Sequence, residues 1–457
     1  MRLSGLDIQH ATGGQWHDLV PDSIESVVTD TRDFESGQTF LALRGPHFDG
    51  HRFAASVADK ALALIGDAHG IKLWKDIRVS QLEVVDTLVA LGDIAHAWRM
   101  QLQGTTVVAI SGSYGKTSLR SILEHGFAAL GMKVAATQAN LNNLIGVPQT
   151  LLQVPVDSDI ALIECGISET GEMKKLAAIV QPDIAILTGL TNAHAEGLGG
   201  MNGVVREKAE LLANMNEAGW YALGDGVAEV LKQAGIEVSQ QALVMDDEDA
   251  AGTVNWSLDG RTLQLNHGSE SALLELQLPA RHWAANMALA ASIMLRYLKQ
   301  NRPHRLSEVA EALSGWQPPA GRMHIIRGSS GCTVLDDCYN ANPVSMQVAV
   351  DTLRALAGKR IAILGDMAEL GEGSEQAHAA LDVSGLDVVY LVGLQMKALA
   401  DAQTEAIWFA TTDDALHAMS RLQFGSNDTV LVKASRSMRL ESIVQVLSRK
   451  QEVADAV

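Results

Sequence analysis

The chain alternates between short apolar runs and stretches with helical spacing over most of its length. Four near-continuous apolar runs in its middle, "TTVVAIS", "DIALIECG", "PDIAILTGL" and "GWYALGDG", predict buried strands. Such runs are typical of a parallel sheet covered by helices on both faces. After the first run, apolar residues recur at helical spacing from Leu119 to Leu130, and Gly131 supplies a helix stop. The middle of the chain is therefore expected to be an α/β unit.

Three regions differ in this pattern. Residues 1–83 mix short strands with turns, and residues 84–314 carry the alternation described above. The segment "GWQPPAGRM" (315–323) has paired prolines and a glycine, which predict a linker or hinge. After it, "GCTVLDDCY", "KRIAILGDM", "LDVVYLVG", "AIWFA" and "DTVLVKAS" predict a second α/β unit of Rossmann-like type. We expect an α/β protein with domains at 1–83, 84–314 and 315–457.

Composition excludes several classes of protein. The 457 residues are 47% hydrophobic and carry a formal net charge of −19, which is unfavourable for gripping nucleic acid or an anionic membrane surface. No apolar run approaches the roughly 18 residues of a membrane span, and the N-terminus lacks the apolar core of a signal peptide. Cys165, Cys332 and Cys338 have no metal-type spacing and are expected to be buried. These features indicate a reduced, cytoplasmic setting.

One segment of the middle region joins a predicted strand, a glycine-rich turn and a predicted helix. The turn "GSYGKTS" (112–118) therefore lies at a helix N-terminus, where free amide groups and the helix dipole favour an anion. Lys116 could reach the outer phosphates of a nucleotide, and the Thr117 hydroxyl could bind Mg²⁺. Ile110 stands where the pattern G-x-x-x-x-G-K-[ST] has its first glycine. The strand–loop–helix setting favours nucleotide binding over a simple turn followed by a surface lysine.

Two polar groups follow the neighbouring predicted strands. Glu164 ends "DIALIE", and His194 lies in "TNAHAEGLGG" after "PDIAILTGL". The carboxyl ends of parallel strands border the ligand crevice of an open α/β sheet, so both groups are expected near the phosphate loop. A carboxylate in that place can bind Mg²⁺. An ordinary strand-end acid and a solvent-exposed histidine remain the alternatives.

Other candidates are less distinct. The helical pattern around Lys208, between Glu207 and Glu210, indicates a surface lysine. Asn286 is either a helix-surface amide or a group that reads a base. Arg322 follows the predicted hinge, so it could swing onto a phosphate when domains close. The segment "DDCYNANPVSM" (336–346) places acids and amides after a buried strand, which favours a site over a plain turn.

Taken in order, these segments resemble the Mur ligases of peptidoglycan assembly over nearly the whole chain. The family's shorter loop pattern, G-x-x-G-K-T-[ST], is satisfied by "GSYGKTS". The first region has "DTR" and "ALRGPHFDGHRF", and the middle has "NLNNLIGVPQTLL", "IECGISETGEM", "NAHAEGLGG" and "REKAEL". The last region has "GRM", "LDDCYNANPVSM", "ILGDMAELGEGS" and "LVKASRSM". The resemblance implies a UDP-sugar-binding N-terminal domain, a central parallel-sheet P-loop ATPase domain and a Rossmann-like C-terminal domain.

The resemblance also implies an activity. It is that of an ATP- and Mg²⁺-dependent ligase, working as a monomer, that joins D-alanyl-D-alanine to UDP-N-acetylmuramoyl-tripeptide through an acyl phosphate. The D-N-P-[RK] motif of the ligase that adds the third peptide residue is absent, and "NANP" stands in the comparable region. Another Mur-type or folylpolyglutamate-type ligase, or a P-loop ATPase without ligation, remains the alternative. Whether the third peptide residue is diaminopimelate or lysine stays open.

Residue roles follow from the resemblance alone. Lys116 resembles the phosphate lysine and Thr117 a Mg²⁺ ligand, with Glu164 and His194 at the metals. Lys208 stands where the family carries a lysine carbamylated by CO₂, which turns a cation into an anion able to hold Mg²⁺. The other ATP-binding candidates are Gly112, Ser113, Tyr114, Gly115, Ser118, Asn142 or Asn143, Asn286 (adenine), Arg322 (interdomain phosphate contact) and Asp337 (ribose). Those for the UDP-sugar are Thr31, Arg32, Arg44 and Gly45, and those for the dipeptide are Tyr339, Asn340, Asn342 and Ser345.

The chain departs from the family pattern at a few positions. Tyr114 replaces the amide of "GSNGKT", "ECGIS" replaces "EMGAN", and "KASRS" replaces "KGSRS". None of these changes removes a charged or metal-facing group, so they are expected to affect loop geometry and rate more than the type of reaction.

Overall fold

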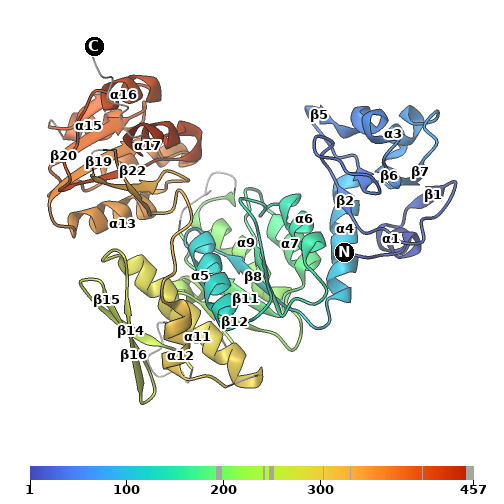
Figure 1. Cartoon of the computed structure of the whole chain (residues 1–457), viewed down its shortest axis with the longest axis horizontal. Helices are drawn as coiled ribbons and strands as arrows, with labels where there is room; N and C mark the ends of the chain where they lie inside the picture. Colours follow the sequence, from blue (N-terminus) through green and yellow to red (C-terminus); the bar gives the residue numbers. More distant parts are fainter. Residues whose placement is uncertain are drawn as a thin grey trace, which may run out of the picture.

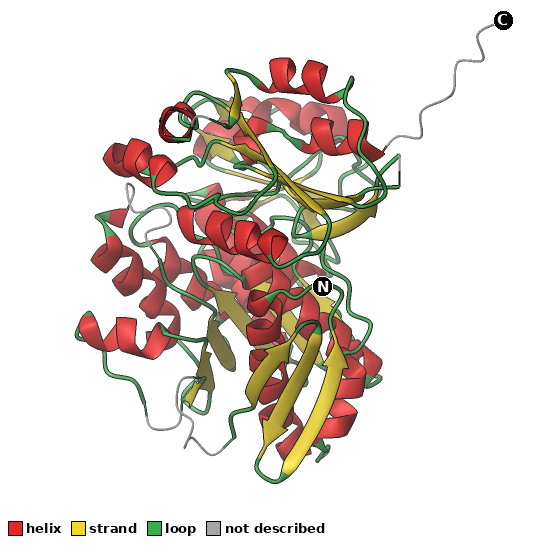
Figure 2. Ribbon diagram, turned by 90° about the vertical axis from the view of Figure 1, so that its left-hand side faces the viewer, coloured by secondary structure: helices red, strands yellow, loops and turns green. Residues whose placement is uncertain are grey.

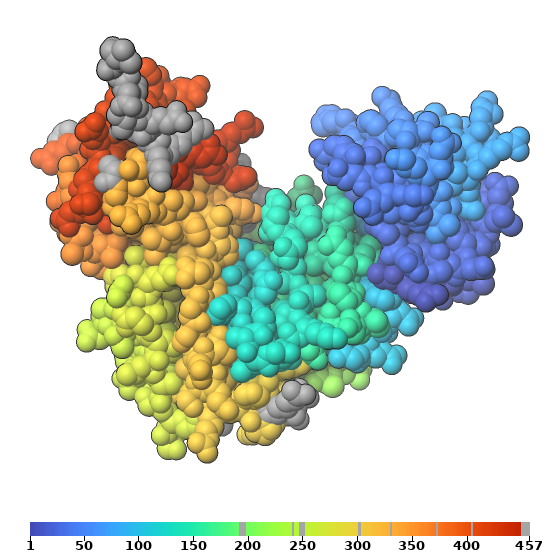
Figure 3. All heavy atoms as spheres, viewed as in Figure 1, coloured from blue at the N-terminus to red at the C-terminus, as the bar shows by residue number. Residues whose placement is uncertain are grey.

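The structure is a computed structural model, and it describes residues 1–191, 198–239, 242–245, 252–301, 303–329, 331–403 and 405–448. An N-terminal part and a C-terminal part stand above a central part, as Figure 1 shows. The space-filling view in Figure 3 shows a wide hollow between the N-terminal part and the C-terminal part, with the central part as its floor. The three parts are therefore in an open arrangement.

The N-terminal part is built on a five-stranded sheet of order β1-β7-β6-β3-β2, in which only β1 is antiparallel to its neighbour. A two-stranded hairpin, β4–β5, projects from it toward the hollow (Figure 1). The strands are β1 (Gln15–His17), β2 (Val27–Val28), β3 (Thr39–Leu41), β4 (Arg44–Gly45), β5 (Phe48–Asp49), β6 (Ala63–Gly66) and β7 (Ser80–Glu83), and the helices are α1 (Gly5–Thr12), α2 (Ala54–Val57) and α3 (Ala68–Leu73).

The helix α4 (Thr87–Gln101) joins the N-terminal part to the central part. Asp86 caps its first turn by accepting from the amides of Leu88 and Val89. The helix packs on α1 on one side and on α6 and α7 on the other. One apolar core therefore runs from Ile8 through Ile94 to Ile163.

The central part contains a six-stranded parallel sheet of order β13-β12-β11-β8-β10-β9. The strand β8 lies between β10 and β11, so the carboxyl ends of these three strands are neighbours. The strands are β8 (Thr106–Ser111), β9 (Val134–Ala136), β10 (Ile160–Glu164), β11 (Ile184–Leu187), β12 (Trp220–Leu223) and β13 (Leu243–Val244). The helices are α5 (Lys116–Ala129), α6 (Gly146–Gln153), α7 (Glu172–Val180), α9 (Met201–Ala213) and α10 (Val227–Gln233).

A small antiparallel sheet follows, which the sequence pattern did not predict. Its strands β14 (Asn255–Asp259), β15 (Thr262–His267) and β16 (Glu270–Glu275) carry only a sparse set of buried residues, because one face is exposed. The sheet packs on α11 (Arg281–Asn301) and α12 (Leu306–Leu313), and both helices pack on α5. It thus extends the central part beside α11 and α12 (Figure 1).

The C-terminal part has a six-stranded sheet of order β17-β18-β22-β19-β20-β21, in which only β17 is antiparallel. Helices cover both faces of this sheet, as Figure 2 shows. The strands are β17 (His324–Arg327), β18 (Thr333–Asp337), β19 (Lys359–Gly365), β20 (Val388–Val392), β21 (Ile407–Phe409) and β22 (Asp428–Lys433), and the helices are α13 (Pro343–Arg354), α14 (Ser374–Ala379), α15 (Lys397–Ala402), α16 (Thr412–Met419) and α17 (Glu441–Ser448).

The α/β fold class and the predicted strands of the middle and last regions are confirmed. All three cysteines are buried and free. The domain limits at residues 83 and 314 stay a prediction. Within the described ranges, no helix combines the length and the apolar composition that crossing a membrane requires.

Candidate nucleotide and metal site

The phosphate loop joins β8 to α5. Gly112 and Gly115 both have positive φ, 150° and 82°, in the region that side chains rarely adopt. Thr188, just beyond β11, donates its hydroxyl to the carbonyl of Tyr114, and the amide of Ser113 donates to the carbonyl of Gly189 at 2.7 Å. The loop is thus fixed to the end of β11, with the first amides of α5 free to face a ligand.

Lys116 lies at the start of α5, where the phosphate oxygens of a nucleotide are expected. Its ammonium donates to the carbonyl of Gly112 at 2.6 Å. Burial lowers the pKa of Lys116 to about 8, and the nearby carboxylate of Glu164 opposes that shift. A bound phosphate would add further negative charge and hold this lysine in its charged form.

Glu164 ends β10 and is almost fully buried. Its carboxylate accepts from the Thr117 hydroxyl at 3.1 Å and from Nε of Arg120 at 2.8 Å. The prediction that strands β8 and β10 bring Thr117 and Glu164 together is therefore confirmed. Sequence reasoning missed Arg120, although its place one turn after Lys116 on α5 was a usable signal.

Lys208 is not the surface lysine that its helical pattern indicated. It is only 1% exposed, because the face of α9 that also carries Val204, Val205 and Leu211 packs toward α7 and the sheet. Burial lowers the pKa of Lys208 well below its usual value, and the positive charge of Lys116 lowers it further. Glu207 is turned away, since its carboxylate accepts from the amides of Gly171 and Met173.

The two neighbouring asparagines have different surroundings. The side chain of Asn143 accepts from the amides of Ile145 and Gly146 at the start of α6. Asn142 lies against Gly166, two residues beyond Glu164, where a Cβ would come within 3.0 Å of its amide. Of the pair, Asn142 therefore has its side chain beside the end of β10, while the amide oxygen of Asn143 is occupied by the helix.

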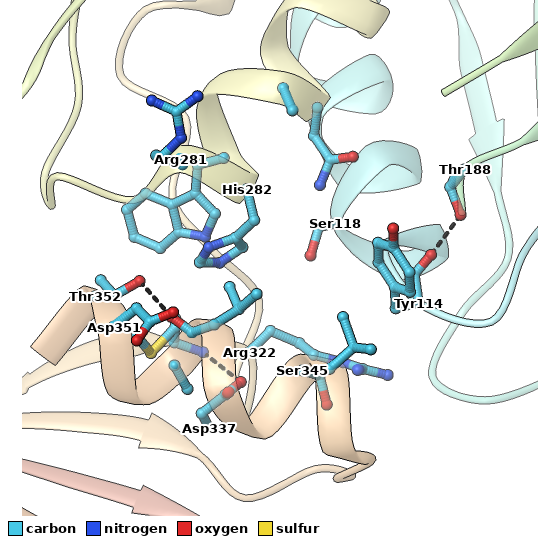
Figure 4. A pocket seen from close by; sticks show the side chains of 18 of the residues that line it. Tyr114, Ser118, Thr188, Arg281, His282, Arg322, Asp337, Ser345, Asp351 and Thr352 are labelled. Carbon is cyan, nitrogen blue, oxygen red and sulfur yellow. Dashed lines mark hydrogen bonds between the residues drawn. The ribbon is translucent and has the colours of Figure 1, made fainter. Parts of the chain in front are cut away.

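A cavity of about 520 Å³ opens beside the phosphate loop, between the central and C-terminal parts (Figure 4). Its central wall includes Tyr114, Gly115 and Ser118, and Asn286 from α11 faces the same space. The lining residues that sequence reasoning missed include Thr188, Asp225, Trp256, Arg281, His282 and Lys433. Lys433 lies in the segment "LVKASRSM", which carried part of the resemblance.

His282 is the most unusual of these lining residues. Its Nδ1 is buried without a hydrogen-bond partner in the described structure. Burial lowers the pKa of His282 to about 4, and the charge of Lys433 adds to that effect. The imidazole is therefore neutral and has a polar atom available inside the cavity.

The C-terminal part supplies the opposite wall of the cavity. Asp337, at the end of β18, pairs with the Lys433 ammonium at 2.7 Å and accepts from the amide of Met323. Burial raises the pKa of Asp337, against the opposing effect of Lys433. Arg322 and Ser345 face the same space (Figure 4).

The residues assigned to the dipeptide follow the carboxyl end of β18 in the C-terminal sheet. Asn342 caps α13 and exchanges hydrogen bonds with Ser345, amide to side chain in both directions. The backbone carbonyl of Asn340 accepts from Lys433 at 3.0 Å. The Arg322 guanidinium stacks over the Tyr339 ring, with its carbon 4.1 Å from the ring centre.

The residues assigned to the UDP-sugar lie apart from this cavity, in the N-terminal part. Arg44 and Gly45 form β4, and Arg44 donates to Asp67 at 3.1 Å. Thr31 and Arg32 lie in the loop after β2, where Arg32 pairs with Asp30. None of these residues lines the cavity beside the phosphate loop, and the N-terminal part that carries them lies across the hollow from the C-terminal part (Figure 3).

His194 lies outside the described residues. Among the described residues, no three His, Cys, Asp or Glu side chains cluster closely enough to hold a metal. Thr117 and Glu164 nevertheless offer the oxygen ligands that Mg²⁺ prefers, and phosphate oxygens of a nucleotide would complete such a site. The donor set therefore fits Mg²⁺ bound together with a nucleotide.

A parallel sheet with a phosphate loop at the centre of its carboxyl edge, beside an interdomain cavity, defines a P-loop nucleotide-binding protein. Two family models match the chain: the Mur ligase middle domain over residues 110–294, and the Mur ligase glutamate ligase domain over residues 321–436. The chain belongs to the Mur ligase family.

Individual relatives show which members of the family this chain is similar to. The UDP-N-acetylmuramoyl-tripeptide–D-alanyl-D-alanine ligase of Escherichia coli is 34% identical over 93% of this chain and 94% of its own length. The Haemophilus influenzae enzyme of the same name is 33% identical over 93% and 94%. A crystal structure of MurF from Acinetobacter baumannii is 29% identical, with a TM-score of 0.84, over 98% of this chain and 99% of its own. MurF from Thermotoga maritima in complex with ADP, at 23% identity and a TM-score of 0.78 over 93% and 97%, shares the fold.

Proposed function

We propose that this protein is an ATP-dependent ligase that joins D-alanyl-D-alanine to UDP-N-acetylmuramoyl-tripeptide and releases ADP and phosphate. The product is the UDP-N-acetylmuramoyl-pentapeptide. The observation that carries the proposal is the convergence of Lys116, Thr117 and Glu164 beside an interdomain cavity. The relatives that match 93% of this chain are named for that activity.

The reaction needs ATP because a carboxylate is a poor acyl donor. The substrate carboxylate attacks the γ-phosphorus of ATP in line, which forms an acyl phosphate and expels ADP. The amine of D-alanyl-D-alanine then attacks the acyl carbon, loses a proton and expels inorganic phosphate. Lys116 exchanges its bond to the Gly112 carbonyl for phosphate oxygens and stabilises the charge that develops there.

Thr117 and Glu164 would hold Mg²⁺. When bound, this ion neutralises phosphate oxygens. Arg120 orients the Glu164 carboxylate, because its guanidinium donates to one oxygen while the Thr117 hydroxyl donates to the other.

Lys208 is proposed to carry a carbamate. Only a neutral amine attacks CO₂, and burial beside Lys116 favours the neutral form of Lys208. Carbamylation turns the neutral amine into an anion, which the positive charge of Lys116 would stabilise. The modified side chain would join Thr117, Glu164 and His194 as a metal ligand.

Closure of the parts would exclude water from the acyl phosphate. The indole of Trp316 packs on Trp283 and donates to the Ser121 hydroxyl at 3.0 Å, which ties it to the central part. Gly321, by contrast, donates to Asp336 of the C-terminal part. The carbonyls of Pro318 and Pro319 accept from His324 and Arg322, so the proposed rotation falls at residues 316–318, inside the predicted hinge.

The substrates enter from different sides of the open hollow. Thr31, Arg32, Arg44 and Gly45 would hold the UDP-sugar, so that its peptide reaches across to the phosphate loop. Asn142 and Asn286 would contact the nucleotide, which lies with its ribose toward Asp337. Tyr339, Asn340, Asn342 and Ser345 form the edge from which the dipeptide amine would approach. We expect a monomer to suffice, because each group in this scheme belongs to one chain.

Phosphate release from purified protein with ATP and Mg²⁺ tests the proposal. UDP-N-acetylmuramoyl-tripeptide, with diaminopimelate or lysine at its third position, and D-alanyl-D-alanine are added singly and together, and the product mass is measured. Release only with both, and a mass gain of one dipeptide less water, is expected. Lys116→Ala should abolish the release, whereas Lys232→Ala, at an exposed site of the central part, serves as the matched control. ATP turnover indifferent to both substrates would point instead to an ATPase without ligation.

A further inference from the structure

Arg322 lies in a short segment whose backbone is fixed to the end of β18. Gly321 donates its amide to Asp336 at 3.1 Å and accepts from the amide of Tyr339 at 3.2 Å. On the other side of Arg322, Met323 donates to Asp337 at 3.0 Å. Arg322 therefore moves with the C-terminal part, and its Cα has a fixed position relative to Tyr339.

Gly321 allows this close approach. Its φ is +72°, and a Cβ there would lie 3.0 Å from the Cβ of Tyr339. Met323 also has a positive φ, 59°, which is uncommon for a residue with a side chain. The chain accepts an unfavourable backbone conformation at this point, where it brings the Arg322 side chain onto the Tyr339 ring.

The Arg322 guanidinium lacks the usual set of hydrogen bonds. Its carbon lies 4.1 Å from the centre of the Tyr339 ring, while its Nε is buried without a hydrogen-bond partner in the described structure. The carboxylate of Asp337, close by in the fold, forms its ion pair with Lys433 and not with Arg322. Burial lowers the pKa of Arg322, although Asp337, Tyr339 and Glu164 oppose that effect.

An aromatic ring holds a cation in a different way from a carboxylate. The ring face attracts the guanidinium through its quadrupole and uses none of the N–H donors. A carboxylate would occupy those donors and repel an incoming phosphate. The arrangement thus keeps Arg322 oriented toward the cavity with its donors available for phosphoryl oxygens.

Arg436 reinforces the position of the ring. Its guanidinium carbon lies 5.7 Å from the Tyr339 ring centre, and it pairs with Glu441 at the start of α17. The Tyr339 ring therefore contacts two cations. Arg436 is held by its ion pair with Glu441, and Arg322 faces the nucleotide cavity.

We propose that Tyr339 is a positioning residue, which orients Arg322 for the transferring phosphoryl group, rather than a residue that binds the dipeptide. This inference rests on the proposed function, in which Arg322 contacts phosphate. The two roles of Tyr339 differ in their kinetic consequences. A dipeptide contact would change KM for D-alanyl-D-alanine, whereas a positioning role lowers the rate through Arg322.

The test is a double-mutant cycle on kcat and on kcat/KM for ATP, with KM for D-alanyl-D-alanine measured in parallel. Tyr339→Leu is expected to lower kcat by about 5- to 30-fold, the range from an exposed to a desolvated cation–π contact, with KM for the dipeptide within about twofold of wild type. Tyr339→Phe keeps the ring and should restore most of the lost rate. In an Arg322→Ala background, Tyr339→Leu should cause no further loss.

Each other outcome contradicts the inference in its own way. Losses that multiply in the double variant, or a raised KM for the dipeptide, would return Tyr339 to the dipeptide site. An Arg322→Ala variant with full activity would remove the phosphate role of Arg322 itself, which belongs to the proposed function. The fold of each variant is checked by its melting temperature, and Tyr339→Met replaces Tyr339→Leu if the latter does not fold.

Discussion

Replacing Lys208 by methionine should stabilise the unliganded protein while destroying its activity. The side chain is 1% exposed, and none of the described residues forms an ion pair or hydrogen bond with its ammonium. Methionine has a similar length and no charge, so it can fill the space between α9 and the sheet. The perturbation therefore removes a group whose burial is unfavourable and leaves the packing in place.

The size of the effect follows from the burial of Lys208. Replacing a buried ion pair with apolar residues of similar volume often stabilises a protein by about 1–4 kcal/mol, and removing the unpaired Lys208 should have an effect of the same order. In a unit of 150–250 residues, each kcal/mol raises the melting temperature by about 2–4 °C. A rise of several degrees in the melting transition of the central part is therefore expected for Lys208→Met in CO₂-free buffer.

The pH dependence gives a second measure of the same effect. The folded-state pKa of Lys208 lies below the value of 10.5 expected for the unfolded chain. Between these two values the unfolded state binds more protons, so the free energy of unfolding rises with pH across that interval. This gain should be present in the wild type without CO₂ and absent in Lys208→Met.

The assay compares melting curves in CO₂-free buffer and in bicarbonate with Mg²⁺. Bicarbonate should raise the melting temperature of the wild type and leave Lys208→Met unchanged. Lys232→Met removes a lysine from an exposed position and controls for the loss of charge. A Lys208→Met variant less stable than the wild type without CO₂ would refute the reasoning, because the lysine would then have a favourable partner.

Three further predictions concern the same reaction. Lys116→Ala should abolish turnover with little change in melting temperature, since among the described residues its ammonium donates to a loop carbonyl alone; an unfolded variant, or one with a near-native rate, would contradict this role. Because the pKa of Lys116 is lowered to about 8 and the charged form binds phosphate, kcat/KM for ATP should fall as pH rises through about 8; a profile that is flat from pH 7 to 9 would exclude this. Lys208→Ala should lose activity, and a short-chain carboxylate added to the buffer should restore part of it; calorimetry of the same variant checks that it is folded, and absence of rescue would weaken the carbamate assignment.

The sequence by itself determined the α/β class, four strands of the central sheet, five of the C-terminal sheet and the phosphate loop; β9, β13 and β17 were missed. These are local properties: β-branched runs form buried strands, and glycines before an amphipathic stretch form a loop at a helix N-terminus. The small antiparallel sheet was missed because polar residues separate Trp256 from Leu258 and Leu263 from Leu265, so these strands lack the continuous apolar runs of the buried ones. The hinge at residues 315–323 stays a prediction, which rests on the paired prolines and the glycine of that segment.

Tertiary structure decided what each polar side chain does. Lys208 looked like a surface lysine, since helical spacing shows which residues share a face and not what that face meets. Arg120, Lys433 and His282 gained their roles only from groups far away in the chain, such as Glu164 for Arg120 and Asp337 for Lys433. Burial and neighbouring charge are properties of the folded chain, and they set the pKa values and the donors left free. The sequence therefore located the chemistry, and packing determined which groups could carry it out.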